Sequence, residues 1–126
     1  REEVQQILSC LHTLRYRVCL SIIYGCGLRL QEGVHLEVRD IDSARMLVHI
    51  RHGKGAKDRY VPLPDSLLPQ LQYFWCTHRH PVWLFPARTA AGVPPCQARG
   101  PRSVSSVQRA FRAALAESGV TKGGPR

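Results

Sequence analysis

Arginine and lysine stand at two glycine-bounded positions where a bound phosphate would account for them. Arg29 in "GCGLRLQEG" falls where a helix is expected to begin, a place where the helix dipole disfavours a cation. A bound anion would compensate for this, because free backbone N–H groups and the guanidinium would converge on one phosphate. Glu32, three residues later, suits the first helical turn and could brace Arg29. An exposed Arg29 that pairs only with Glu32 is the alternative.

Lys54 in "HGKGAKDRY" lies between two glycines at the expected tip of a β-hairpin. Small neighbours let such a tip enter a groove and place the ammonium beside a phosphate, and Lys57 and Arg59 add positive charge there. A solvated lysine whose glycines only permit positive φ is the alternative. Neither glycine-rich stretch completes a nucleotide-binding loop: Leu30 occupies the third glycine position of G-x-G-x-x-G, and G-x-x-x-x-G-K-[ST] has no match.

The charge balance favours a polyanionic partner. The 126 residues form one domain or part of one, with 18 Lys and Arg against 9 Asp and Glu and a net charge of +9. Nucleic acid is the first candidate for that partner. A helix from Ser103 to Gly119 would gather Arg102, Arg109 and Arg112 on one face, which we interpret as a surface for the DNA backbone.

The spacing of apolar residues predicts a mainly helical fold with a small antiparallel β-sheet, an α+β class. Helices are expected over 2–12, 14–24, 28–37, 65–77 and 103–119, and strands over 45–51 and 58–63 with their hairpin loop at 53–57. The helix over 14–24 is apolar nearly all round, which is typical of the centre of a domain. Pro62 makes its strand an edge strand. Residues 86–102, rich in Pro, Gly and Ala, are expected to form an exposed loop.

Cysteine, histidine and tyrosine positions suggest no further chemistry. Five cysteines, odd in number and without C-x-x-C, are interpreted as reduced and buried in a cytosolic protein. The longest apolar stretch is too short to span a bilayer, and no metal-ligand spacing is seen, so no membrane and no metal or other cofactor is expected. His78 and His80 are interpreted as surface residues at a helix end. The four tyrosines are placed inside core or strand elements: Tyr16, Tyr24, Tyr60 and Tyr73.

Taken in order, "YGCGLRLQEGVHLEVRDID" and "HIRHGKGAKDRYVPLP" resemble the tyrosine recombinases, also called phage integrases. "VWLFPA" and "SVQRAFRAALAESGV" resemble later segments of that family more loosely. The resemblance implies that Arg29 grips the scissile phosphate of duplex DNA and that Glu32 supports the site. It also implies that Lys54 is the general acid that protonates the 5′ oxygen leaving group, and that neither metal nor ATP is required.

The resemblance implies a partial catalytic domain over residues 1–126. The family's N-terminal core-binding domain would precede it, and an H-x-x-R helix, a later His or Trp and the nucleophilic tyrosine would follow "ESGVTKGG". "HTLRYR" at 12–17 mimics H-x-x-R but precedes Arg29, whereas the family places that motif afterwards. Without the tyrosine hydroxyl no 3′-phosphotyrosine forms, so this chain alone is expected to bind DNA without recombining it. Apolar surface left uncovered is expected to favour self-association or an oligomer on DNA.

The leading interpretation is therefore a DNA-binding part of a site-specific recombinase or integrase of the bacterial cytosol or nucleoid. The complete protein would cleave and rejoin DNA strands. A non-catalytic DNA-binding or regulatory remnant of a recombinase is the alternative, and duplex binding without cleavage would identify it. A basic RNA-binding module is a third class, against which the lack of an aromatic stacking platform counts, with Tyr60 the only exposed ring expected.

Overall fold

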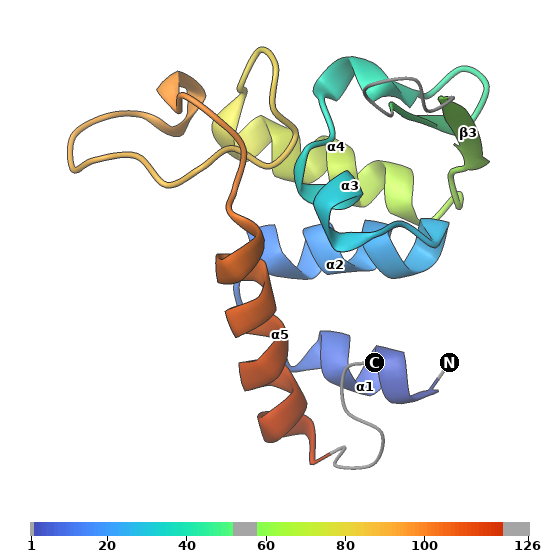
Figure 1. Cartoon of the computed structure of the whole chain (residues 1–126), viewed down its shortest axis with the longest axis vertical. Helices are drawn as coiled ribbons and strands as arrows, with labels where there is room; N and C mark the ends of the chain where they lie inside the picture. Colours follow the sequence, from blue (N-terminus) through green and yellow to red (C-terminus); the bar gives the residue numbers. More distant parts are fainter. Residues whose placement is uncertain (1, 52–57, 120–126) are drawn as a thin grey trace.

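The computed structural model describes residues 2–51 and 58–119, which form a bundle of helices beside a three-stranded sheet (Figure 1). The α-helices of these residues are α1 (Glu2–Ser9), α2 (Leu14–Cys26), α3 (Leu30–Val34), α4 (Leu67–His78) and α5 (Val104–Ser118). Two 3-10 helices, η1 (Val38–Asp40) and η2 (Pro95–Gln97), lie in the connections. The predicted α+β class is confirmed.

Helix α2 is the centre of the helical layer, as its all-round apolar character predicted. It contacts α1, α3, α4 and α5. The helix runs two residues further than predicted and includes Gly25. A glycine at this position lets α4 pack close to α2, since an added Cβ would lie 2.8 Å from Leu67 Cδ1. It ends at Gly27, whose φ of +66° turns the chain toward α3 and whose N–H donates to the Ile23 carbonyl.

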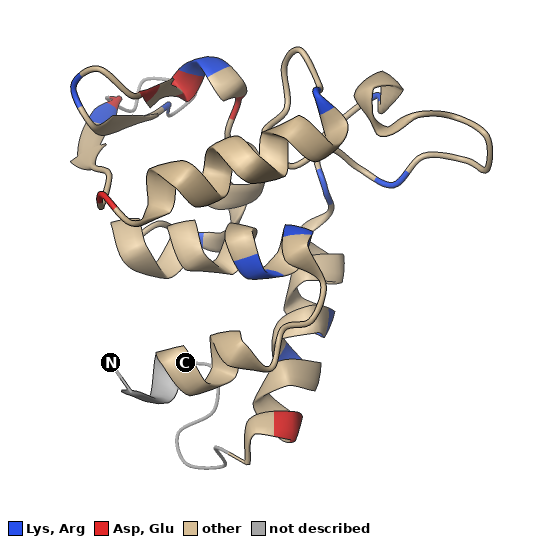
Figure 2. Cartoon of the chain, turned by 180° about the vertical axis from the view of Figure 1, so that it is seen from behind, with Lys and Arg blue, Asp and Glu red and all other residues tan. Residues whose placement is uncertain are grey.

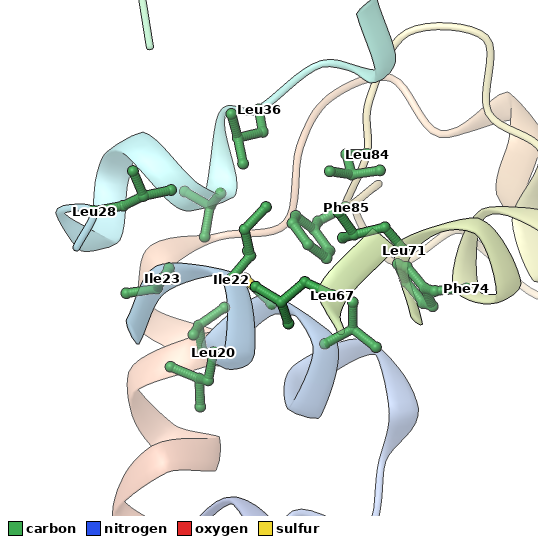
Figure 3. Packing of buried hydrophobic residues seen from close by; sticks show 14 of the residues in the cluster. Leu20, Ile22, Ile23, Leu28, Leu36, Leu67, Leu71, Phe74, Leu84 and Phe85 are labelled. Carbon is green, nitrogen blue, oxygen red and sulfur yellow. The ribbon is translucent and has the colours of Figure 1, made fainter. Parts of the chain in front are cut away.

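The hydrophobic core fills the space between α2, α3 and α4 (Figure 3). Ile22 of α2 is fully buried there, and the rings of Phe74 of α4 and Phe85 stack with 5.6 Å between their centroids. Phe85 and its neighbour Leu84 come from the proline-bounded "PVWLFP" segment, of which residues 84–86 are buried while Pro81 and Val82 are exposed. This core fixes the end of α2 and hence the position of Arg29, which follows it.

The sheet contains β1 (Ile41–Asp42), β2 (Leu47–Ile50) and β3 (Arg59–Pro62) in the order β1-β2-β3, with antiparallel pairs. Both predicted strands are confirmed, although each is shorter than expected, and the two-residue β1 was not predicted. β3 is an edge strand, as Pro62 requires. Ile50 pairs with Arg59 at the end of the ladder. The predicted loop with Lys54 and Lys57 lies outside the described residues.

Helix α5 has the ends that its sequence predicted. The Ser103 hydroxyl accepts a hydrogen bond from the Ser106 N–H at 3.2 Å, and Gly119 ends the helix with a φ of +76°. Far from its start, α5 packs on α1, where Gln6 Nε2 donates to the Ser118 carbonyl at 2.9 Å. The loop over 86–102 is largely exposed as predicted, and a bridge between Pro86 and Pro101 closes its two ends.

The surface placement of His78 and His80 is wrong, since their residues are only 7% and 5% exposed. His78 Nε2 bonds to the Leu84 carbonyl and its Nδ1 accepts from the His80 N–H. His80 Nε2 bonds to the Ala98 carbonyl, and its Nδ1 accepts the N–H groups of residues 82 and 83. The two imidazole rings therefore hold the chain that follows α4 by hydrogen bonds to its backbone groups. The position of the histidines at a helix end does not reveal this role.

Two further placements need correction. All five cysteines are free, as predicted, but they are not all buried. Cys19 is fully buried, which raises the pKa of its thiol to about 12, whereas Cys76 is exposed. Tyr24, Tyr60 and Tyr73 are 45%, 60% and 67% exposed, because each lies on the outward side of its helix or edge strand. Tyr60 is therefore not the only exposed ring. No helix in the described part of the chain is long and apolar enough to cross a membrane.

Candidate functional site

A hollow of about 980 Å³ lies where α3, η1, the end of β2 and the first turns of α5 approach one another. Arg29 and Glu32 line it from the start of α3, and Arg51 lines it from the end of β2. Trp83 and Gln108 border it from the segment after α4 and from α5. The hollow, called the Arg29 groove below, therefore brings together parts of the chain that are up to eighty positions apart.

Arg29 occupies the residue position immediately before α3. Its backbone N–H donates to Glu32 Oε1 at 2.8 Å, so Glu32 caps the helix start. The predicted contact between the two residues is thus present, but it is made by the backbone of Arg29. The Arg29 side chain is exposed on the groove, and no acidic side chain among the described residues forms an ion pair with it.

The Glu32 carboxylate instead holds the guanidinium of Arg59. Arg59 Nη1 donates to Glu32 Oε2 at 2.8 Å and Nη2 donates to Oε1 at 3.1 Å. The Glu32 side chain is 10% exposed and that of Arg59 40%, and these hydrogen bonds raise the pKa of Arg59. The pair ties α3 to β3, so Arg59, predicted as a DNA contact, has a structural partner within the protein.

A second ionic network supports the other side of the groove. Arg51 donates from Nε and Nη2 to the two carboxylate oxygens of Asp40 at 3.1 and 3.0 Å, and from Nη2 to Glu37 at 2.8 Å. Hydrogen bonding to Asp40 is the main reason why the pKa of Arg51 is raised. Asp40 is only 3% exposed and also accepts the Glu37 N–H. The sequence gives no local sign of this network, because Arg51 stands 11 and 14 positions from its two partners.

His49 extends the network toward the hairpin. Its ring stacks on Tyr60 with 4.7 Å between centroids, and Nε2 lies 2.9 Å from Asp58 Oδ2. Its other nitrogen lies 3.8 Å from Asp40 Oδ1. His49 therefore links η1, β2 and the residue that precedes β3.

The three arginines predicted to share one face do not stay together. Arg109 and Arg112 are exposed on α5, and Arg112 lines a smaller hollow of about 510 Å³ together with Arg29. Arg102 precedes the helix and lies over the ring of Tyr16, 5.7 Å from its centroid, where burial lowers its pKa. It faces the start of α2, a different part of the molecule.

Acidic and basic residues are distributed differently over the structure (Figure 2). Around η1 and the sheet both kinds lie together, whereas the start of α2 and the entry to α5 carry basic residues and no acidic ones. Around the Arg29 groove, Arg51 and Arg59 are paired with carboxylates. Unlike these two arginines, Arg29 forms no ion pair with an acidic side chain of the described residues, so its guanidinium is available to a bound anion.

Solved structures share this fold. The crystal structure of XerA recombinase matches 97% of this chain and 43% of its own with a TM-score of 0.76 and 19% identity. The structure of XerH site-specific recombinase bound to difH substrate, a pre-cleavage complex, matches 95% of this chain and 36% of its own with a TM-score of 0.70 and 17% identity. At these identities the similarity shows the fold alone.

Curated relatives match parts of the chain at higher identity. The putative integrase/recombinase y4eF of Sinorhizobium fredii is 45% identical over 89 residues, which are 71% of this chain and 36% of that protein. The tyrosine recombinase XerA of Thermococcus onnurineus is 43% identical over 76 residues, which are 59% of this chain and 27% of that protein. The chain thus matches about a third of these relatives or less. The model of the phage integrase family matches residues 1–125. The chain therefore belongs to the phage integrase family, the tyrosine recombinases, as its two motifs predicted.

Proposed function

We propose that this chain is part of the catalytic domain of a site-specific tyrosine recombinase that acts on duplex DNA. The observation that supports this most directly is the Arg29 guanidinium, which lies on a groove of about 980 Å³ without an acidic partner in the described residues. Family membership gives that groove its chemistry, and the net charge of +9 suits a DNA partner.

In the proposed reaction, the tyrosine hydroxyl of the complete protein gives its proton to a base or to water, and the tyrosine oxygen attacks a DNA phosphorus. A bond from the tyrosine oxygen to phosphorus forms while the bond from phosphorus to the 5′ oxygen breaks. Arg29 stabilises the charge on the non-bridging oxygens, and Lys54 transfers its proton to the departing 5′ oxygen. Glu32 has a positioning role, because it holds both the Arg29 backbone and Arg59.

The proposed DNA contacts are Lys57, Arg59, Arg102, Arg109 and Arg112. Arg109 and Arg112 are exposed on α5, so they are available to a DNA backbone. The proposal includes self-association or a recombinase oligomer on DNA, and a site of action in the cytosol or nucleoid, where DNA is found. A change of apparent mass with protein concentration, measured with and without duplex DNA, tests the oligomer.

A change of the leaving group distinguishes the proposed role of Arg29 from that of Lys54. In the complete protein that contains this chain, Arg29→Gln should lower the rate of strand cleavage by roughly 10² to 10³-fold, while duplex binding changes little. Lys54→Ala should slow cleavage of ordinary DNA by roughly 10² to 10⁴-fold. A substrate with sulfur in place of the bridging 5′ oxygen needs no proton at its leaving group, so it should restore cleavage by Lys54→Ala but not by Arg29→Gln.

The matched control for both variants is Arg45→Gln, an exposed arginine of the turn between β1 and β2. It removes one positive charge away from the groove and should cleave normally. Cleavage by Arg29→Gln at the rate of the unaltered protein would overturn the proposed role of Arg29. Duplex binding by a complete protein that never forms a covalent DNA complex would instead favour a non-catalytic DNA-binding protein.

A further inference from the structure

A hollow of about 370 Å³ at the start of α2 is lined by three arginines, Arg15, Arg88 and Arg102. No aspartate or glutamate lines it. Within residues 2–51 and 58–119, none of the three forms an ion pair with an acidic side chain. The hollow differs in this from the Arg29 groove, where four carboxylates lie among the lining residues.

Two of the arginines are held in place by one aromatic ring. The guanidinium carbon of Arg15 lies 5.1 Å from the centroid of the Tyr16 ring, and that of Arg102 lies 5.7 Å from it. Stacking of this kind fixes the plane of a guanidinium and leaves its N–H edges for hydrogen bonds. The ring therefore orients two positive groups before any ligand arrives, which lowers the entropy lost on binding.

One of the lining arginines carries an unsatisfied donor. Arg15 Nε is buried and has no hydrogen-bond partner in the described part of the chain. A buried N–H without a partner is destabilising, and more so when the group is charged. An acceptor would satisfy it once the Arg15 side chain turns this N–H toward the hollow.

The charges in the hollow also repel one another. Burial, together with the nearby charges of Arg15 and Arg88, lowers the pKa of Arg102. Burial acts to raise the pKa of Tyr16, but hydrogen bonds with Ser106 and Arg15 and the charges of Arg102 and Arg15 outweigh it and lower that pKa. In both shifts the neighbouring arginine charges contribute beside burial and hydrogen bonds, so the three arginines lie close enough to repel one another, and a multiply charged anion would relieve that repulsion.

The hollow is separate from the Arg29 groove. Arg15 is the second residue of α2, whereas Arg29 follows the end of that helix. A helix of 13 residues is about 20 Å long, so the two arginines lie at opposite ends of α2. The segment that enters α5 connects the two places: Arg102, which precedes the helix, lines the hollow, and Val104 and Gln108 of the helix line the groove.

We propose that Arg15, Arg88 and Arg102 form a second phosphate-binding site. Arginine forks suit tetrahedral phosphate oxygens, and three of them without a carboxylate suit phosphate better than a single carboxylate ligand. The favoured source is a backbone phosphate of duplex DNA, because a polyanion that follows the start of α5 could contact both places. Only this choice of source rests on the proposed function, since a free oligophosphate offers the same chemistry.

The experiment titrates inorganic pyrophosphate and, separately, a duplex DNA of arbitrary sequence into the protein and three variants. Arg88→Gln is the main variant, because Arg88 is exposed and packs on no ring. Arg15→Gln tests the clamped arginine, and Arg45→Gln is the charge-matched control. Arg88→Gln and Arg15→Gln should each weaken pyrophosphate binding roughly tenfold, whereas Arg45→Gln should not. Circular dichroism spectra identify any variant that fails to fold.

The DNA arm identifies the source of the phosphate. If the site takes a DNA phosphate, Arg88→Gln should also reduce the slope of log K against log salt concentration by about 1. Loss of pyrophosphate binding alone would assign the site to a free oligophosphate, and absence of DNA binding in the unaltered protein would contradict the proposed function but not the site. If Arg88→Gln changes neither titration relative to Arg45→Gln, the second phosphate-binding site is overturned.

Discussion

The carboxylate of Glu32 holds the guanidinium of Arg59 through two hydrogen bonds of 2.8 and 3.1 Å, and the same carboxylate accepts the backbone N–H of Arg29. One side chain thus fixes the start of α3 to β3, the strand that follows residues 52–57. Arg29, one of the proposed catalytic residues, stands at the start of the helix that this contact holds. In the proposed function Glu32 is therefore a positioning residue for Arg29.

The Glu32 contact can be measured in a double-mutant cycle. Glu32→Gln and Arg59→Leu should each lower the free energy of unfolding, and their coupling energy should be about 1 kcal/mol, because a bidentate pair with one side largely buried is stronger than a surface pair. Urea unfolding gives the four values. The exposed pair of His12 and Glu117 is the control, and Glu117→Gln should change stability by less than about 0.5 kcal/mol. A coupling energy near zero would show that Glu32 and Arg59 do not stabilise the junction.

Gly33 controls the distance between α3 and α2. A Cβ at this residue would lie 2.7 Å from Ile23 Cδ1 and closer still to Cγ1. Gly33→Ala should therefore lower the free energy of unfolding by about 1 to 3 kcal/mol and displace Arg29. In the double variant with Ile23→Ala the two losses should be less than additive. Gly100→Ala is the control, since an added Cβ meets no atom within 4 Å there; equal losses in both glycine variants would refute the steric explanation.

Asp40 stabilises the other side of the groove from a buried position. Asp40→Asn leaves Arg51 with a weaker partner, so the free energy of unfolding should fall by about 2 to 3 kcal/mol. Asp42→Asn is the matched control, because Asp42 is two positions away and its contacts with Arg45 are exposed. Thermal unfolding of the two variants under the same conditions decides this. A similar melting temperature for both would mean that burial of Asp40 contributes nothing.

His78 makes stability depend on pH in a defined direction. Burial is the main reason why its pKa lies below the ordinary value of 6.5. As the pH falls below 6.5 the unfolded chain binds a proton that folded His78 does not accept, so the free energy of unfolding decreases until the lowered folded pKa is reached. Above pH 6.5 His78 is neutral in both states, so the free energy of unfolding no longer depends on pH through this residue.

His78→Gln should therefore flatten the decrease of stability between pH 6.5 and the acid limit of folding. Urea unfolding at a series of pH values measures the slope. Gln72→Ala, an exposed change on the same helix, should leave the slope of the unaltered protein. If His78→Gln retains the full slope, other groups cause the acid sensitivity.

The exposed face of α5 gives a prediction for DNA. Reversal of Arg109 and Arg112 to Glu should weaken binding similarly for all duplex sequences and flatten its salt dependence, because backbone contacts carry no sequence information. Anisotropy titrations at several salt concentrations test this. Since both side chains are exposed, the fold should be unaffected. Unchanged affinity for duplex DNA would show that this face of α5 does not contact the DNA backbone.

Several features followed from the sequence because their causes are local. The two ends of α5, at Ser103 and Gly119, depend on backbone and side-chain groups within a few residues. The edge position of β3 follows from the missing N–H of Pro62. The motifs around Arg29 and Lys54 identified the family for the same reason, since each is a continuous stretch.

Tertiary structure alone decided which side chains meet. Glu32 binds Arg59 across 27 positions rather than the Arg29 guanidinium, because the fold brings the Arg59 side chain of β3 within reach of the start of α3. Arg102 does not lie on the same face as Arg109 and Arg112, because its guanidinium packs over the ring of Tyr16 of α2. Spacing in a sequence fixes which residues share one element. Packing between elements determines the partner of each charge, and that partner decides whether the charge remains available to a ligand.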